Sequence, residues 1–151
     1  MPTHYEGSKQ QKDTLNAFIK LMRATESLNQ RLCRHLSEAD LTVSQFGILE
    51  ALMHLGPQSQ KELGEKLLKS GGNITMVIDN LEKNGFVTRK KNPDDRRALI
   101  IDLTFQGKSF IQDFFPKHLE KITEEFDVLD EKEKKELGRI CKKLGMKEEQ
   151  N

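Results

Sequence analysis

Residues 70–85 read Ser70-Gly71-Gly72-Asn73-Ile74-Thr75-Met76-Val77-Ile78-Asp79-Asn80-Leu81-Glu82-Lys83-Asn84-Gly85. Four apolar side chains recur in this stretch at i, i+3, i+4 and i+7, a spacing that places them on one face of an α-helix: Ile74, Val77, Ile78 and Leu81. Ser70 is suited to cap the start of such a helix and Gly85 to end it. The acidic residues Asp79 and Glu82 lie only in its second half. The stretch therefore predicts a helix with one buried face, whose first turns carry no negative charge.

The segments on either side of this helix predict another helix and two strands. Ser59-x-x-Glu62 is a capping box that opens a short helix, and its inward side chains are Leu63, Leu67 and Leu68. Strands are predicted at 86–91 and 98–103, joined by a type I turn at Asn92-Pro93-Asp94-Asp95. Cations surround this hairpin: Arg89, Lys90, Lys91, Arg96 and Arg97. A helix-turn-helix followed by a basic hairpin is a winged helix, and such a motif places its second helix in the major groove of DNA.

The order of these motifs resembles the MarR-type (multiple antibiotic resistance regulator) family of transcription factors. The resemblance covers roughly residues 13–145, and its most specific part is Asp95-x-Arg97 followed by Leu103-Thr104. It implies that Arg97 enters the minor groove of DNA and that Asp95 orients it. Narrow A·T-rich minor grooves attract arginine electrostatically, so this role is chemically reasonable.

We expect the DNA contacts to come from the helix that begins near residue 70 and from the hairpin. Asn73 can pair with adenine, Thr75 can bond a base or a phosphate, and Met76 can contact a thymine methyl group. The other cations of the hairpin are expected beside phosphates, where they set affinity more than sequence preference. The complete predicted set is Ser70, Gly71, Gly72, Asn73, Thr75, Met76, Arg89, Lys91, Asp95, Arg96 and Arg97.

The rest of the chain predicts long amphipathic helices around this lobe. We interpret residues 1–151 as a single, mostly α domain with a small β-hairpin wing. Its parts are a disordered lead at 1–12, dimerisation helices at 13–39 and 104–145, and a winged helix-turn-helix lobe at 42–103. Pro116 lies inside the predicted helix after Thr104 and should kink it. The terminal helices carry more apolar surface than the lobe can cover. This excess predicts an intertwined homodimer that binds a pseudo-palindromic duplex, and the family resemblance implies the same arrangement.

The composition neither indicates nor excludes a nucleic-acid partner. The formal net charge is only +1, although Ser59–Arg97 holds nine Lys or Arg against six Asp or Glu. This near-neutral balance keeps open an alternative, a winged helix that binds other proteins and not DNA. Two cysteines and the absence of an apolar signal core or membrane-length run predict a cytoplasmic protein.

The family resemblance also implies a small-molecule effector, of aromatic or phenolic type, that binds between the dimer helices and the DNA-binding lobe. The candidate lining residues are Phe18, Met22, Phe46, Leu49, Met53, Phe110 and Phe114. Each of them is equally an ordinary core residue by its own pattern. Repression released by such a ligand is the commoner mode of control in the family, and we adopt it as the hypothesis.

Redox control is the alternative within the regulator class, because some members of the family sense oxidants through a thiol. Cys33 lies late in its helix, away from the position that such members use, and Cys141 completes an apolar stripe that predicts an interior place. The histidines at 4, 35, 54 and 118 show no metal-binding spacing, and no nucleophile or cofactor motif occurs. The sequence therefore predicts no metal, no cofactor and no enzymatic activity.

Overall fold

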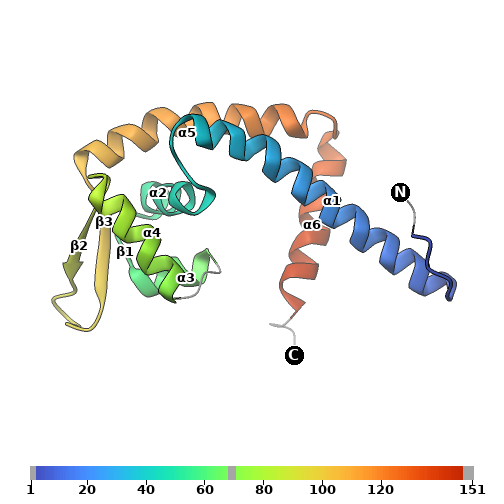
Figure 1. The fold of residues 1–151 in the computed structure, drawn as a ribbon, viewed down its shortest axis with the longest axis horizontal. Coiled ribbons are helices and arrows are strands. Elements are labelled where there is room, and N and C mark those ends of the chain that lie inside the picture. The colour runs from blue at the N-terminus through green and yellow to red at the C-terminus, as the bar shows by residue number, and fades with distance from the viewer. Residues whose placement is uncertain (1–2, 68–70, 148–151) are drawn as a thin grey trace. The chain divides into compact units, whose positions relative to one another are not determined.

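The computed structural model describes residues 3–67 and 71–147, which form a mostly helical winged-helix fold (Figure 1). This confirms the predicted fold class. The elements are α1 (Lys9–Glu38), α2 (Val43–Leu55), β1 (Gln58–Ser59), α3 (Gln60–Lys66), α4 (Gly71–Lys83), β2 (Val87–Lys91), β3 (Leu99–Leu103), α5 (Phe105–Phe126) and α6 (Glu131–Gly145). The chain divides into two compact units, Met1–His118 and Leu119–Asn151, so their boundary falls inside α5.

Reciprocal capping boxes start four of the helices. Those at Thr42, Ser59 and Asp130 begin α2, α3 and α6. Ser8 and Gln11 form a fourth box, so α1 begins at Lys9. The helix therefore begins four residues before the predicted start near Asp13, and Lys9–Lys12 belong to it and not to the predicted disordered lead. The first turn of α1 carries no apolar stripe, so only the capping residues mark its start.

The sheet has three antiparallel strands in the order β1–β3–β2. The β2–β3 hairpin pairs Val87 with Leu103 at its base, and β1 adds Ser59 opposite Ile100. Sequence reasoning missed β1 because two residues are too few to show an alternating pattern. Since Ser59 also caps α3, this strand fixes the start of α3 against the hairpin.

The core of the lobe forms around α2, whose apolar residues point in several directions. Ile48 and Leu49 are fully buried, and they lie among side chains from other elements of the lobe. The predicted stripe of α4 is confirmed, with Ile74, Ile78 and Leu81 buried and Val77 half-buried. The remaining buried apolar residues of this core are Leu36, Leu41, Phe46, Leu52, Leu63, Val87, Ile101, Ile111 and Phe114.

The chain leaves α4 through a tight hydrogen-bonded turn at Gly85, which has a positive φ of 80°. The N–H of Phe86 donates to the carbonyl of Leu81 at 2.9 Å, and the N–H of Gly85 donates to that of Glu82 at 3.0 Å. This is a Schellman motif, which needs a left-handed residue at the position of Gly85. The predicted helix stop at Gly85 is therefore confirmed.

The start of α5 is fastened to that same turn. The Thr104 hydroxyl donates to the Gly85 carbonyl at 2.6 Å and also accepts from the N–H of Gly107 at 2.9 Å. A Cβ added at Gly107 would lie 2.0 Å from the carbonyl oxygen of Phe86. Glycine at this position therefore lets the first turn of α5 pack directly on the backbone that leaves α4.

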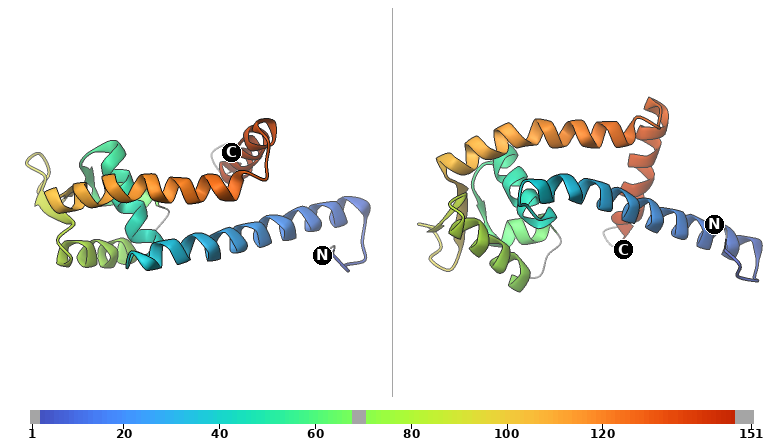
Figure 2. Two further views of the ribbon diagram at one scale, coloured as in Figure 1. Left: turned by 90° about the horizontal axis from the view of Figure 1, so that it is seen from above. Right: turned by 45° about the horizontal axis from the view of Figure 1, so that its top comes forward.

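The helices at the two ends of the chain bury little. The N-terminal turns of α1 project beyond the lobe (Figure 2), and Phe18 and Met22 are about half exposed there. α6 has no buried residue, and Cys141 is exposed, which corrects the predicted interior place of this thiol. α5 continues through Pro116 as one helix. None of the helices in the described part of the chain is long and apolar enough to cross a membrane.

Candidate nucleic-acid interface

The exposed face of α4 presents the residues predicted to read DNA. Asn73, Thr75 and Met76 are all exposed, while the buried stripe on the opposite side holds the helix on the core. Gly71 begins the helix, and a Cβ at Gly72 would meet nothing within 4 Å. Ser70 lies outside the described residues. The N-terminal half of α4 therefore offers a small polar and apolar surface without acidic groups.

α3 contacts this face through Gln60, a residue that sequence reasoning missed. Its amide Nε2 donates to the hydroxyl oxygen of Thr75 at 2.7 Å. Its Oε1 is buried and makes no hydrogen bond to the residues that the structure describes. The contact links the first residue of α3 to the recognition surface, and no periodic signal in the sequence points to it.

The tip of the hairpin is held by side chain-to-backbone hydrogen bonds. Oδ1 of Asp95 accepts from the N–H of Arg97 at 3.0 Å, and the N–H of Ala98 donates to the Asp95 carbonyl at 3.0 Å. The i→i+3 hydrogen bond thus closes a turn at Asp95–Ala98, after the turn predicted at Asn92–Asp95. The predicted segment is held by an Asx turn, in which the N–H of Asp94 donates to Oδ1 of Asn92 at 3.0 Å. Arg96 and Arg97 are exposed at this tip.

Arg89 does not behave like the other cations of the hairpin. Its guanidinium forms an ion pair with Asp79, lies 3.6 Å from Glu82, and donates from Nη2 to the carbonyl of Thr75 at 3.1 Å. Its side chain is only 18% exposed. In the single chain its donors therefore bind the recognition helix, and its place beside phosphate stays a prediction. Lys91, by contrast, is exposed at the end of β2.

The seven residues predicted to line an effector pocket are divided between two places. Phe46, Leu49 and Phe114 are buried in the core of the lobe, and Met53 and Phe110 pack against it. Phe18 and Met22 lie on the exposed part of α1. Within the single chain, these residues therefore do not form the lining that was predicted.

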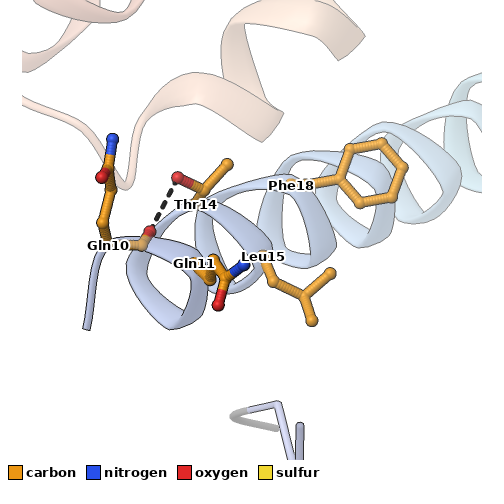
Figure 3. Close-up of a pocket in the computed structure, with 5 residues that line it drawn as sticks. All are labelled: Gln10, Gln11, Thr14, Leu15 and Phe18. Carbon is orange, nitrogen blue, oxygen red and sulfur yellow. Dashed lines mark hydrogen bonds between the residues drawn. The ribbon is translucent and has the colours of Figure 1, made fainter. Parts of the chain in front are cut away.

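An open hollow lies on the first turns of α1 (Figure 3), and it shares only Phe18 with the predicted set. Leu15 and Phe18 give it an apolar side, and Gln10, Gln11 and Thr14 complete it. The hydroxyl of Thr14 donates to the carbonyl of Gln10 at 2.9 Å and is thereby held by its own helix.

Two histidines that are far apart in sequence meet where α1, α2 and α5 join. The Nδ1 atoms of His35 and His118 lie 3.1 Å apart, and both rings stack near Phe114. Burial, followed by the nearby His35, lowers the pKa of His118 below its ordinary value. His118 follows Phe110 and Phe114 at helical spacing, a signal that could have predicted its burial. Among the described residues, no three metal-ligating side chains gather as a metal site requires.

This arrangement defines a class of protein. An exposed helix face without acidic groups in its first half, next to a hairpin with cations at its tip, is the reading surface of a winged-helix DNA-binding protein. Comparison with known proteins identifies the family within this class. The model of the MarR family matches residues 41–99. HTH-type transcriptional regulator MhqR of Bacillus subtilis (strain 168) is 35% identical over 137 residues, which span 91% of this chain and 94% of that relative. The chain belongs to the MarR family and is a DNA-binding transcriptional regulator.

Further comparisons extend the likeness to the fold as a whole. HTH-type transcriptional repressor YetL of the same Bacillus strain is 27% identical, over 88% of this chain and 83% of that protein. The crystal structure of Sco3205 from Streptomyces coelicolor in complex with DNA has a TM-score of 0.85 and 22% identity, covering 95% of this chain and 91% of that one. NadR in complex with 4-hydroxyphenylacetate has a TM-score of 0.72 and 24% identity, covering 95% and 97%.

Proposed function

We propose that the protein is a cytoplasmic homodimeric repressor that leaves its operator when a small aromatic or phenolic ligand binds. The observation that carries the DNA-reading half of this proposal is the pairing of the exposed α4 face with the exposed cations of the hairpin tip. Sco3205 offers support, since a chain of this fold has been crystallised with DNA.

The dimer proposal is supported by large apolar side chains that are at least half exposed within the described residues. Phe18 and Met22 of α1 are 56% and 51% exposed, and Leu144 of α6 is 58% exposed. Such stripes on amphipathic helices are ordinarily buried against another helix surface. A second copy would bury them and would place two reading surfaces on one duplex. We expect a pseudo-palindromic operator whose half-sites are roughly 34 Å apart.

In each half-site, Asn73, Thr75 and Met76 would face base edges in the major groove, and Arg97 would enter the flanking minor groove. Gly71 and Gly72 would allow close backbone approach, and Asp95 would hold Arg97 in place. Lys91 and Arg96 would lie near phosphates.

Repression and ligand control are each supported by one relative. YetL is called a repressor, and NadR was crystallised with 4-hydroxyphenylacetate. A ligand weakens DNA binding only if it binds one spacing of the two reading surfaces better than another. We propose that the site forms in the dimer, where α1 residues such as Phe18 and Met22 would meet a partner surface. The structure gives no observation that favours thiol sensing by Cys33, which is half-buried.

The DNA-reading proposal is tested by fluorescence anisotropy with the protein's own upstream DNA and with duplexes selected from a random pool. Arg97→Ala should weaken binding to A·T-flanked sites roughly tenfold, the scale of about 1.4 kcal/mol from a good specific contact. The matched control is Arg23→Ala, which removes an exposed arginine from α1. Equal losses in the two variants would mean that only total charge matters. If wild type binds every duplex alike, at a Kd of roughly 10⁻⁴–10⁻⁶ M, the operator proposal fails.

The ligand proposal is tested on the same complex. Adding a phenolic acid such as 4-hydroxyphenylacetate over a concentration series should lower the affinity for the operator. A flat response across phenolic and other aromatic compounds would contradict it.

A further inference from the structure

We propose that Arg89 is a positioning residue, which sets the angle between the recognition helix α4 and the wing, and that it does not neutralise DNA phosphate. The proposal rests on the DNA-reading surface described above and concerns how that surface is held together. Its evidence is the set of groups that surround the guanidinium.

The three partners of Arg89 lie along one side of α4. They are the carbonyl of Thr75 and the carboxylates of Asp79 and Glu82, which follow one another at i, i+4 and i+7. That spacing places them on one helix face, here the face that lies beside β2. A single side chain from the wing therefore contacts α4 over about two turns.

The guanidinium is also withdrawn from solvent. Its side chain is 18% exposed, and its Nε is buried without a hydrogen-bond partner among the described residues. Asp79 and Glu82 are about half exposed on the DNA-reading helix, where unpaired carboxylates would repel phosphate. Arg89 offsets these two charges from its place on β2, while Lys91, Arg96 and Arg97 stay exposed for DNA.

Thr75 is held from a second side. Gln60 of α3 donates to its hydroxyl oxygen at 2.7 Å, while Arg89 of β2 donates to its carbonyl at 3.1 Å. The residue that we expect to face the DNA is thus fixed by both elements that flank α4. Because the guanidinium is a planar fork with several donors in fixed directions, lysine cannot reproduce these contacts.

The experiment compares operator affinity over a salt series for Arg89→Lys, Arg89→Gln, Asp79→Asn and a control, Lys91→Gln. Arg89→Lys keeps the charge but should still lower affinity about tenfold, the scale of one lost charge-assisted hydrogen bond. Asp79→Asn makes the surface more positive, so simple electrostatics predicts tighter binding. We expect it to bind several-fold more weakly.

The salt dependence separates positioning from phosphate contact. Arg89→Gln should keep the wild-type slope of log K against log salt, whereas Lys91→Gln should reduce its magnitude by about 0.9, the contribution of one phosphate contact. If Arg89→Lys binds as wild type, if Asp79→Asn binds more tightly, or if Arg89→Gln loses slope as the control does, the proposal is wrong.

A measurement without DNA keeps the proposal independent of the operator. Amide hydrogen exchange in β2 and in the second half of α4 should accelerate in Arg89→Lys and Asp79→Asn and stay unchanged in Lys91→Gln. Unchanged exchange in all variants would overturn the positioning role. If wild type shows no operator preference, the repressor proposal falls, while the exchange result still decides the role of Arg89.

Discussion

The winged-helix lobe and the C-terminal helix α6 contain similar apolar residues but place them differently. In the lobe, Leu49 and Leu63 have no exposed surface, because α2, α3, α4, β3 and α5 all contribute to one core. In α6, Leu137, Ile140 and Leu144 form an equally regular stripe, yet they are 38–58% exposed. The difference shows that helical periodicity identifies a face that will be buried but does not say which chain will bury it.

The two regions also differ in how their helices are stabilised. The α4 helix of the lobe ends in a Schellman motif and is held by core contacts and by Arg89. α6 relies on its own capping box and on surface pairs such as Arg139 with Glu136, which are worth little in water. A helix of about four turns without tertiary packing is marginal. We therefore expect α6 to depend on a second copy of the chain.

The largest expected effect comes from removing a core side chain from the lobe. Leu49→Ala should lower the free energy of unfolding by about 3 kcal/mol, by the same amount at every protein concentration. Leu144→Ala, the matched change in α6, should instead raise the protein concentration at which the dimer dissociates, because it weakens a dimer contact. Urea unfolding measures the first change, and sedimentation over a dilution series measures the second. An unchanged dissociation constant in Leu144→Ala would contradict the packing of α6 on a second copy.

A smaller effect, with opposite signs in the two regions, is expected from adding one methyl group. Gly107→Ala places a Cβ against the carbonyl oxygen of Phe86 and should destabilise the lobe by about 2 kcal/mol. Gly138→Ala, on α6, meets nothing within 4 Å and should stabilise by up to about 1 kcal/mol through helix propensity. Thermal unfolding of the two variants beside wild type measures both changes. A loss at Gly138 would show that a partner helix packs against that position.

The smallest effect is a pH dependence that comes from the lobe. His118 has a pKa below its ordinary value of 6.5, so the unfolded chain binds a proton that the folded chain does not. Its stabilising contribution is therefore present above pH 6.5 and falls as the pH drops toward the lowered pKa, by at most about 1.4 kcal/mol per pH unit. His118→Phe should make the free energy of unfolding depend less on pH between neutral and mildly acidic conditions. An unchanged slope in that variant would assign the dependence to another group.

Much of the fold could be predicted from local patterns. The apolar spacing of Ile74, Ile78 and Leu81 is enough to orient α4, and the capping residues Thr42 and Ser59 mark where helices begin. These signals work because they involve residues within about one or two helical turns. The wing follows from its strands, although its tip also has a hydrogen-bonded turn at Asp95–Ala98 that was not predicted.

The contacts that hold the site together could not be predicted, because they join distant parts of the chain. Arg89 looked like any cation of a basic hairpin until the structure placed it beside Asp79 and Glu82. His35 and His118 are 83 residues apart and meet only after α1 and α5 pack. The effector pocket was inferred from a family resemblance. In the single chain, its predicted lining residues lie partly in the lobe core and partly on the exposed part of α1.

The hairpin is closed at its base, so the length of the wing does not affect the path of the chain between α4 and α5. Thr104 bonds the carbonyl of Gly85, and Val87 pairs with Leu103, so the two ends of the hairpin are joined before the strands leave the lobe. Residues inserted or deleted at the tip, in 92–98, would therefore leave both helices where they are. The reach of the wing along DNA can thus evolve without altering the helix that leads away from the lobe, and changes in that helix need not alter the wing.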